Sequence, residues 1–208
     1  MTHQYRETVT LAITGASGAQ YGLRLLECLV QANCQVFVMV SRAAQVVIAT
    51  ETEERLPGGP SEQTDYLISR FDARADQIRV FGKEQWMAPV ASGSGAPSKM
   101  VVCPCSTSTL SAIACGASNT LIERAADVAL KERRQLILVP REAPYSEIHL
   151  EHMLKLTRMG TVVIPASPGF YNKPQTIDDM IDFVVARILN QLQIEQSLLP
   201  RWGEDSVS

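Results

Sequence analysis

The chain has no long apolar run and no excess of charge of either sign. Its 208 residues include 19 Lys and Arg against 22 Asp and Glu, a net charge of −3, so composition does not indicate a nucleic-acid or anionic-membrane partner. No apolar stretch reaches the roughly 18 residues of a membrane helix, and the polar residues 1–8 lack the apolar core of a secretory signal. We therefore expect a soluble, cytoplasmic protein.

The number and spacing of the cysteines and histidines predict neither a disulfide framework nor a metal site. The five cysteines are odd in number and lie mostly in apolar segments, which favours reduced thiols. Cys103 and Cys105 are one residue too close for a CxxC half-site, and no histidine lies near them. His149 and His152 share a helix face without an evident third ligand, so we predict no metal and give them no role.

The order of apolar patterns predicts an α/β fold. An apolar fraction of 46% with 20% charged residues is enough for one core. Strand-like and helical segments alternate, which is typical of a Rossmann-like or flavodoxin-like doubly wound parallel sheet in three α/β/α layers. We expect a single domain over residues 1–208 with a tail at 195–208. The predicted strands are 8–14, 35–41, 99–103, 135–140 and 161–165, and the predicted helices are 18–32, 42–52, two segments between 104 and 134, 146–159 and a last one from about 177.

Two stretches interrupt this alternation. Pro57 to Pro60 (PGGP) is a clear break. Residues 78–99 are the least regular part, and the GSGAP sequence at 93–97 suggests a mobile surface loop rather than a domain linker.

Glycine and hydroxyl residues follow the predicted strands where open parallel sheets bind ligands. Gly15-Ala16-Ser17-Gly18 follows the first strand, Ser41 the second, and Ser106-Thr107-Ser108-Thr109 the third. Free amides at such helix starts favour an anion. The glycine spacing is not GxGxxG and no acidic residue closes the second strand, so a mononucleotide fits better than a dinucleotide. Taken singly, each motif is equally well explained as a helix cap.

Cationic residues form a second group. Arg124 and Lys131 are seven residues apart and share a helix face, although a solvated, salt-bridged face explains them as well. Arg141 ends an apolar strand, Tyr171 lies in a loop after another, and Arg187 interrupts an apolar helix flank. Together, these last three side chains are candidates to hold a phosphate.

Two carboxylates are candidates for proton transfer. Glu142 directly follows a predicted strand, and Glu51 closes the helix after the second strand. Glu51 is also consistent with a solvated helix end, because Glu53 and Glu54 follow it.

Several longer motifs together resemble the flavin prenyltransferases of the UbiX type, which belong to a wider group of FMN-binding proteins. The resemblance runs through nearly the whole chain. The matching segments are TGASGAQYGLRLL at 14–26, PCSTSTLSAIACG, ERAADVALKERRQLILVPREAPYSEIHLEHM, PASPGFYNKPQTIDDMIDFVVARIL and Arg201-Trp202.

The resemblance implies transfer of a dimethylallyl group from dimethylallyl phosphate to N5 and C6 of reduced FMN without a divalent metal. The product, prenylated FMN, would serve a UbiD-type decarboxylase, for example in ubiquinone biosynthesis. It also implies a homo-oligomer, typically a dodecamer, with active sites at subunit junctions. The implied FMN ligands are Gly15, Ala16, Ser17, Ser41, Ser106, Thr107, Ser108, Thr109 and Arg141, and the implied substrate ligands are Arg124, Lys131, Arg141, Tyr171 and Arg187.

Four residues carry hypothetical roles in the chemistry. Glu142 handles protons during ring closure, and Ser17 with Glu51 positions or shuttles a proton near N5. Trp202 stabilises the allyl cation by a cation–π contact of about 0.5 to 2 kcal/mol.

Two other functions remain open at this point. A flavin-dependent decarboxylase of the cysteine-decarboxylase type shares the FMN-binding parts, but this chain has PCSTST where that group has PASANT. A non-catalytic flavin carrier would need the glycine turn and the hydroxyl run, but not the cationic set.

Overall fold

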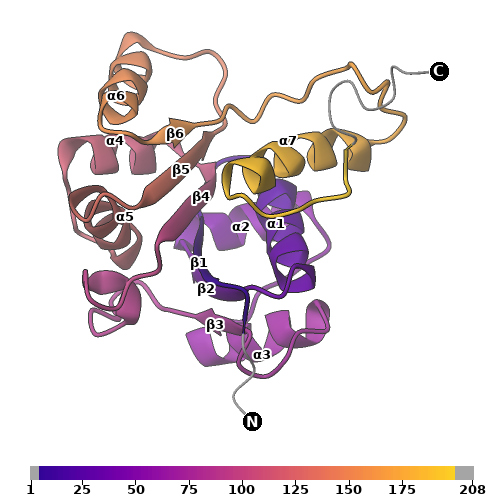
Figure 1. Ribbon diagram of the computed structural model, residues 1–208, viewed down its shortest axis with the longest axis horizontal. Helices are drawn as coiled ribbons and strands as arrows, with labels where there is room; N and C mark the ends of the chain where they lie inside the picture. Colours follow the sequence, from indigo (N-terminus) through magenta and orange to yellow (C-terminus); the bar gives the residue numbers. More distant parts are fainter. Residues whose placement is uncertain (1–4, 200–208) are drawn as a thin grey trace.

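The computed structural model describes residues 5–199 and contains one six-stranded parallel sheet (Figure 1). The strand order is β3-β2-β1-β4-β5-β6. The strands are β1 (Thr8–Ile13), β2 (Gln35–Val40), β3 (Ile78–Val80), β4 (Lys99–Cys105), β5 (Gln135–Pro140) and β6 (Val162–Val163). The order reverses between β1 and β4, as in doubly wound sheets, and the predicted fold class is confirmed.

Helices cover both faces of the sheet, which gives the three predicted layers (Figure 1). One core packs the sheet against α1 (Ala19–Gln31), α2 (Arg42–Glu51), α3 (Pro60–Arg70) and α7 (Ile177–Gln191). The other packs it against η1 (Pro89–Ala91), α4 (Thr107–Cys115), α5 (Leu121–Lys131) and α6 (Glu147–Arg158). None of the helices within residues 5–199 is long and apolar enough to cross a membrane.

The apolar pattern of each central strand explains why it lies in the middle of the sheet. All residues of β1 after Thr8 are buried, because helices cover both of its faces. Cys103 and Cys105 are completely buried in β4, where burial raises the pKa of the Cys105 thiol to about 12. These two thiols are therefore protonated packing groups.

Two elements of the fold were not predicted from the sequence. Helix α3 buries only Gln63 and Leu67, so it has no apolar stripe, and β3 has three residues. Helix α3 begins at the end of the predicted break, and β3 lies at the start of the stretch 78–99 that the sequence analysis described as the least regular. The expected break at 57–60 is confirmed as the loop that leads into α3 at Pro60.

The GSGAP loop at 93–97 is hydrogen-bonded to another part of the chain. The guanidinium of Arg134 donates hydrogen bonds to the carbonyls of Gly93, Ala96 and Pro97. The expected mobility of residues 93–97 therefore has no support in their contacts, since three backbone acceptors are held by one side chain.

Candidate active site

The carboxyl ends of β1, β2 and β4 are joined where the strand order reverses. The Oγ1 atom of Thr14 donates to the Pro104 carbonyl at 2.9 Å and accepts from the Ser106 amide at 2.8 Å. The Ser41 amide donates to the Ile13 carbonyl at 3.0 Å. The turn after β1 and the starts of α2 and α4 are thus held together at the place where such sheets bind ligands.

The turn after β1 depends on two of its glycines. A Cβ atom on Gly15 would lie 2.4 Å from the Cβ of Ala43, so a larger residue would force the turn away from α2. Gly18 has a φ of 100°, in the left-handed region that other residues rarely adopt. Glycine at these two positions therefore allows a tight turn that packs closely against α2.

Three helices begin at this edge, each with a hydroxyl residue at its N-cap. Ser41 precedes α2, Ser106 precedes α4 and Thr120 precedes α5. Each hydroxyl accepts a backbone amide of its own helix, from Ala44 at 3.1 Å, Thr109 at 3.3 Å and Glu123 at 3.3 Å. The remaining first-turn amides lack intrahelical partners and carry the positive end of the helix dipole, so the three starts favour a bound anion.

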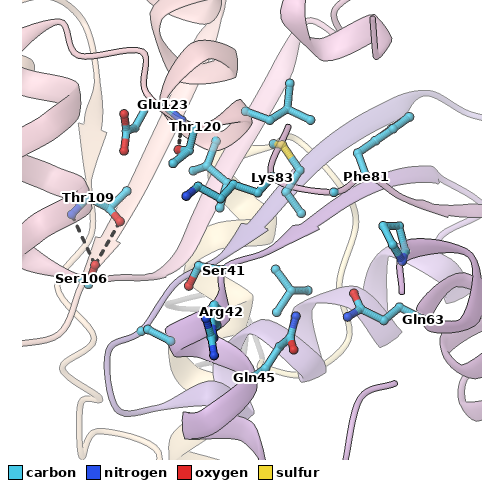
Figure 2. Close-up of a pocket in the computed structure, with 18 of the residues that line it drawn as sticks. Ser41, Arg42, Gln45, Gln63, Phe81, Lys83, Ser106, Thr109, Thr120 and Glu123 are labelled. Atoms are coloured by element: carbon cyan, nitrogen blue, oxygen red, sulfur yellow. Dashed lines mark hydrogen bonds between the residues drawn. The ribbon is translucent and has the colours of Figure 1, made fainter. Parts of the chain in front are cut away.

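A cavity of about 700 Å³ lies between these helix starts (Figure 2). Its volume is in the range of pockets for cofactor-sized ligands. Its wall includes five of the predicted FMN ligands, Gly15, Ser41, Ser106, Ser108 and Thr109. The other four do not line it: Ala16 and Thr107 are next to lining residues in the chain, Ser17 is two residues from Gly15, and the fourth is Arg141.

The cavity also has lining residues that the sequence analysis did not single out. Figure 2 shows Gln63, Phe81, Lys83, Thr120 and Glu123 around it. The spacing of Thr120 and Glu123 is that of a helix start and was available as a signal. Gln63, Phe81 and Lys83 had none, because they lie in α3 and in the irregular stretch after β3.

Glu51 caps α1 from another helix. Its Oε2 atom accepts the amides of Gly18 at 2.7 Å and Ala19 at 3.2 Å, and it is hydrogen-bonded to the Ser17 hydroxyl. Burial raises the pKa of this carboxyl, but these hydrogen bonds and the nearby Arg141 hold the pKa below its ordinary value of 4.5. Glu51 is therefore a fixed anion joined to Ser17, and its reading as a solvated helix end is wrong.

Replacing Glu51 by Gln should remove part of the acid sensitivity of the fold. Because the pKa of Glu51 is lower when folded, its ionised form stabilises the protein above the ordinary value of 4.5, and this contribution disappears as the pH falls further. Denaturant unfolding from pH 7 to pH 3 should show the free-energy difference between wild type and Glu51→Gln shrinking below about pH 4.5. Glu53→Gln, which removes an exposed carboxylate nearby, should leave the wild-type profile unchanged; an equal effect of both variants would contradict this.

Arg141 lies beside Ser17 on the rim of the site. Its Nε atom donates to the Ser17 carbonyl at 3.2 Å. Burial raises the pKa of Tyr145, which the neighbouring Glu142 raises further and Arg141 lowers. Burial likewise raises the pKa of Tyr21, and Arg141 opposes this too. The structure thus brings Arg141 together with Ser17 and Glu142, and adds two tyrosines that the sequence analysis missed.

Arg124 and Lys131 are not among the described residues that line the cavity, although Arg124 directly follows the lining residue Glu123. Arg124 donates to the Ala91 carbonyl at 3.1 Å and pairs with Asp127 at 3.0 Å. Lys131 pairs with Glu132 at the last turn of α5. The first turn of α5 lines the cavity, and eleven helical residues span about 15 Å. Lys131 is therefore at the opposite edge of the sheet from Ser106.

The other predicted substrate ligands are on the surface. Tyr171 is 77% exposed in the loop before α7, and Arg187 is exposed on α7. Neither lines the cavity among the described residues. Trp202 lies outside the described residues.

The chain is similar to known flavoproteins along most of its length. Residues 1–189 match the model of the family described as Flavoprotein. The chain is 65% identical over 198 residues to the flavin prenyltransferase UbiX of Pseudomonas aeruginosa, with 95% of each chain covered.

Two solved structures are similar throughout. AnUbiX (PadA1), in complex with FMN and dimethylallyl pyrophosphate, is 40% identical with a TM-score of 0.84, and the match covers 95% of this chain and 97% of that one. A dodecameric FMN-dependent UbiX-like decarboxylase from Escherichia coli O157:H7 is 39% identical with a TM-score of 0.81, covering 94% and 98%. The chain therefore belongs to the UbiX family of flavin prenyltransferases.

Proposed function

We propose that this protein transfers the dimethylallyl group of dimethylallyl phosphate to N5 and C6 of reduced FMN. The observation that carries the proposal is the cavity at the reversal of strand order, where three hydroxyl-capped helix starts converge. The same proposal is supported by a relative solved with FMN and a dimethylallyl ester. It extends the family assignment to a substrate and to individual residues.

The residues at this edge suit FMN. The first-turn amides of α2 and α4, with the hydroxyls of Ser41 and Ser106, match the phosphate in charge and hydrogen bonding. Gly15, Ala16, Ser17 and Arg141 would face the remainder of the molecule. When bound, reduced FMN supplies N5 and C6, the two ring atoms to which the C5 unit is joined.

Cations are proposed to take the place of a metal at the leaving group. The C–O bond of the allylic phosphate breaks and its electron pair remains on the phosphate, which gains negative charge. Fixed cations lower the energy of that charge most effectively in a site from which water is excluded. The proposed ligands are Arg124, Lys131, Arg141, Tyr171 and Arg187, and Trp202 is proposed to face the allyl cation.

Two groups are proposed to transfer protons during the reaction. Glu142 is half-buried next to Arg141, so a carboxylate is available at the rim for the proton that leaves during ring closure. Ser17 is joined to Glu51, which the α1 amides keep ionised. That arrangement suits a hydroxyl that accepts a proton near N5 and hands it on.

The complete site is proposed to form between copies of this chain. Lys131 and Arg141 belong to opposite edges of one sheet, so both can meet one phosphate only if a neighbour contributes one of them. Large apolar side chains are exposed on α6 and around the start of α7, including Ile148, Phe170 at 69% and Ile177 at 76%. Such exposure is typical of surfaces covered by a partner, and a homododecamer accounts for it.

We further propose that the product leaves for a UbiD-type decarboxylase, as in ubiquinone biosynthesis. The free thiols Cys28, Cys34, Cys103, Cys105 and Cys115 fit a reducing compartment such as the cytoplasm.

The test is anaerobic incubation of the purified protein with reduced FMN and dimethylallyl phosphate. Mass spectrometry should find a flavin heavier by one C5 unit, and a chelator should not reduce its yield. Dimethylallyl diphosphate in a parallel reaction measures the preferred leaving group. An unchanged flavin mass together with release of CO₂ from a phenylacrylic or cysteine-derived acid would favour a decarboxylase, and an unchanged mass with tight FMN binding would favour a carrier.

A further inference from the structure

Lys83 lines the cavity from the turn after β3, a strand that the sequence pattern did not predict. It follows β3 by three residues, at the edge of the sheet that also carries Ser41 and Ser106. Figure 2 shows its ammonium group directed toward Thr120, with Ser41 and Ser106 also on the cavity wall. A cation thus faces the same space as the hydroxyl-capped helix starts.

The backbone around Lys83 is held at both sides. The Leu121 amide donates to the Lys83 carbonyl at 2.9 Å, which ties the residue to the start of α5. Phe81, two residues before Lys83, is buried, and its ring packs edge-on against that of Phe37 at 5.3 Å between centroids. Lys83 is therefore carried by an anchored segment, although its own side chain is exposed.

The charges around this ammonium leave it available to a ligand. Glu123 and Arg42 are the other charged residues of the described cavity wall. The Glu123 carboxylate accepts the Asn119 amide at 2.7 Å and forms no ion pair with Lys83 in the described part of the chain. Arg42 lies beside Gln45 on another wall (Figure 2). The cavity therefore has more positive than negative charge.

We propose that Lys83 is a further ligand of the FMN phosphate. This rests on the proposed function, because it requires FMN in this cavity. A phosphate monoester carries a charge of about −1.5 to −2 at neutral pH, and the helix starts supply only partial charges. Lys83 adds a full charge and distinguishes FMN from riboflavin, which has the same ring and ribityl chain without the phosphate.

The test compares FMN and riboflavin binding by flavin fluorescence or calorimetry in wild type and Lys83→Gln. The variant should bind FMN about tenfold more weakly, as for the loss of one hydrogen bond to a charged group. Its riboflavin affinity should not change, and its FMN affinity should depend less on salt. Lys83→Arg should keep most of the FMN affinity. Lys155→Gln, which removes a lysine that donates to the Ala114 carbonyl, is the matched control.

Two outcomes would overturn the assignment. An unchanged FMN affinity in Lys83→Gln, or an equal loss for FMN and riboflavin, would show that the ammonium does not meet the phosphate, and would leave the proposed function intact. Wild-type protein that bound FMN no more tightly than riboflavin would contradict both this assignment and the proposed function.

Discussion

Replacing Glu142 by glutamine is expected to slow formation of the heavier flavin by about 10²- to 10⁴-fold, the usual range for a general acid or base. The amide keeps the size of the side chain and one acceptor oxygen for the Ala143 amide, which Glu142 holds at 3.1 Å. It cannot take a proton. FMN affinity should therefore stay at the wild-type value, and the loss should be found in single-turnover rates at saturating substrate.

The control for Glu142 is Glu151→Gln. Glu151 is an exposed carboxylate on α6 and does not line the cavity. The Glu151→Gln variant should form the heavier flavin at the wild-type rate. Full activity of Glu142→Gln would remove the proton-transfer role, whereas an equal drop in both variants would point to a general effect of charge.

Co-expression of two inactive variants is expected to restore activity if the site is shared between copies. Arg141→Ala and Lys131→Ala each remove a cation from the leaving group, and each alone should cost about 10²- to 10³-fold, as for the loss of one fixed donor to a developing charge. In mixed oligomers some sites receive an intact Arg141 from one copy and an intact Lys131 from another. Rates per mole of protein should therefore rise well above those of either variant.

The control pair for this experiment is Arg141→Ala with Glu142→Gln. These residues are adjacent in the chain, so one copy supplies both and no mixed site is complete. That mixture should stay inactive. Failure of the first pair to recover, with mixed oligomers confirmed by mass, would contradict the shared site.

The central elements of the fold were predictable because their residues are buried on a regular period. Strands β1, β2, β4 and β5 consist mainly of apolar residues and agree with the predicted ranges to within two residues. Helix α5 carries a clear apolar stripe. Helix α3 and strand β3 were not predicted, since an edge strand of three residues and a helix that buries two side chains leave no period to detect.

Some residues of the candidate site could likewise be predicted from the sequence, and others could not. The hydroxyl and glycine motifs were found because each follows a strand directly, and the parallel sheet brings the ends of β1, β2 and β4 to one edge. Lys83 was missed because its place at that edge depends on β3. Glu51 was identified as a candidate, but its fixed ionised state was not predicted, because the amides that keep it ionised belong to α1.

The sequence by itself determined the layered α/β fold and the chemistry of its loops, because apolar periodicity and the residues after each strand are local properties. Only the tertiary structure decided which of those residues meet. It joined Ser17 to Glu51 and Arg141, placed Lys83 in the wall of the cavity that the α4 start also lines, and separated Lys131 from that cavity by the length of a helix. These distances depend on how helices pack across the sheet, which no spacing along the chain specifies.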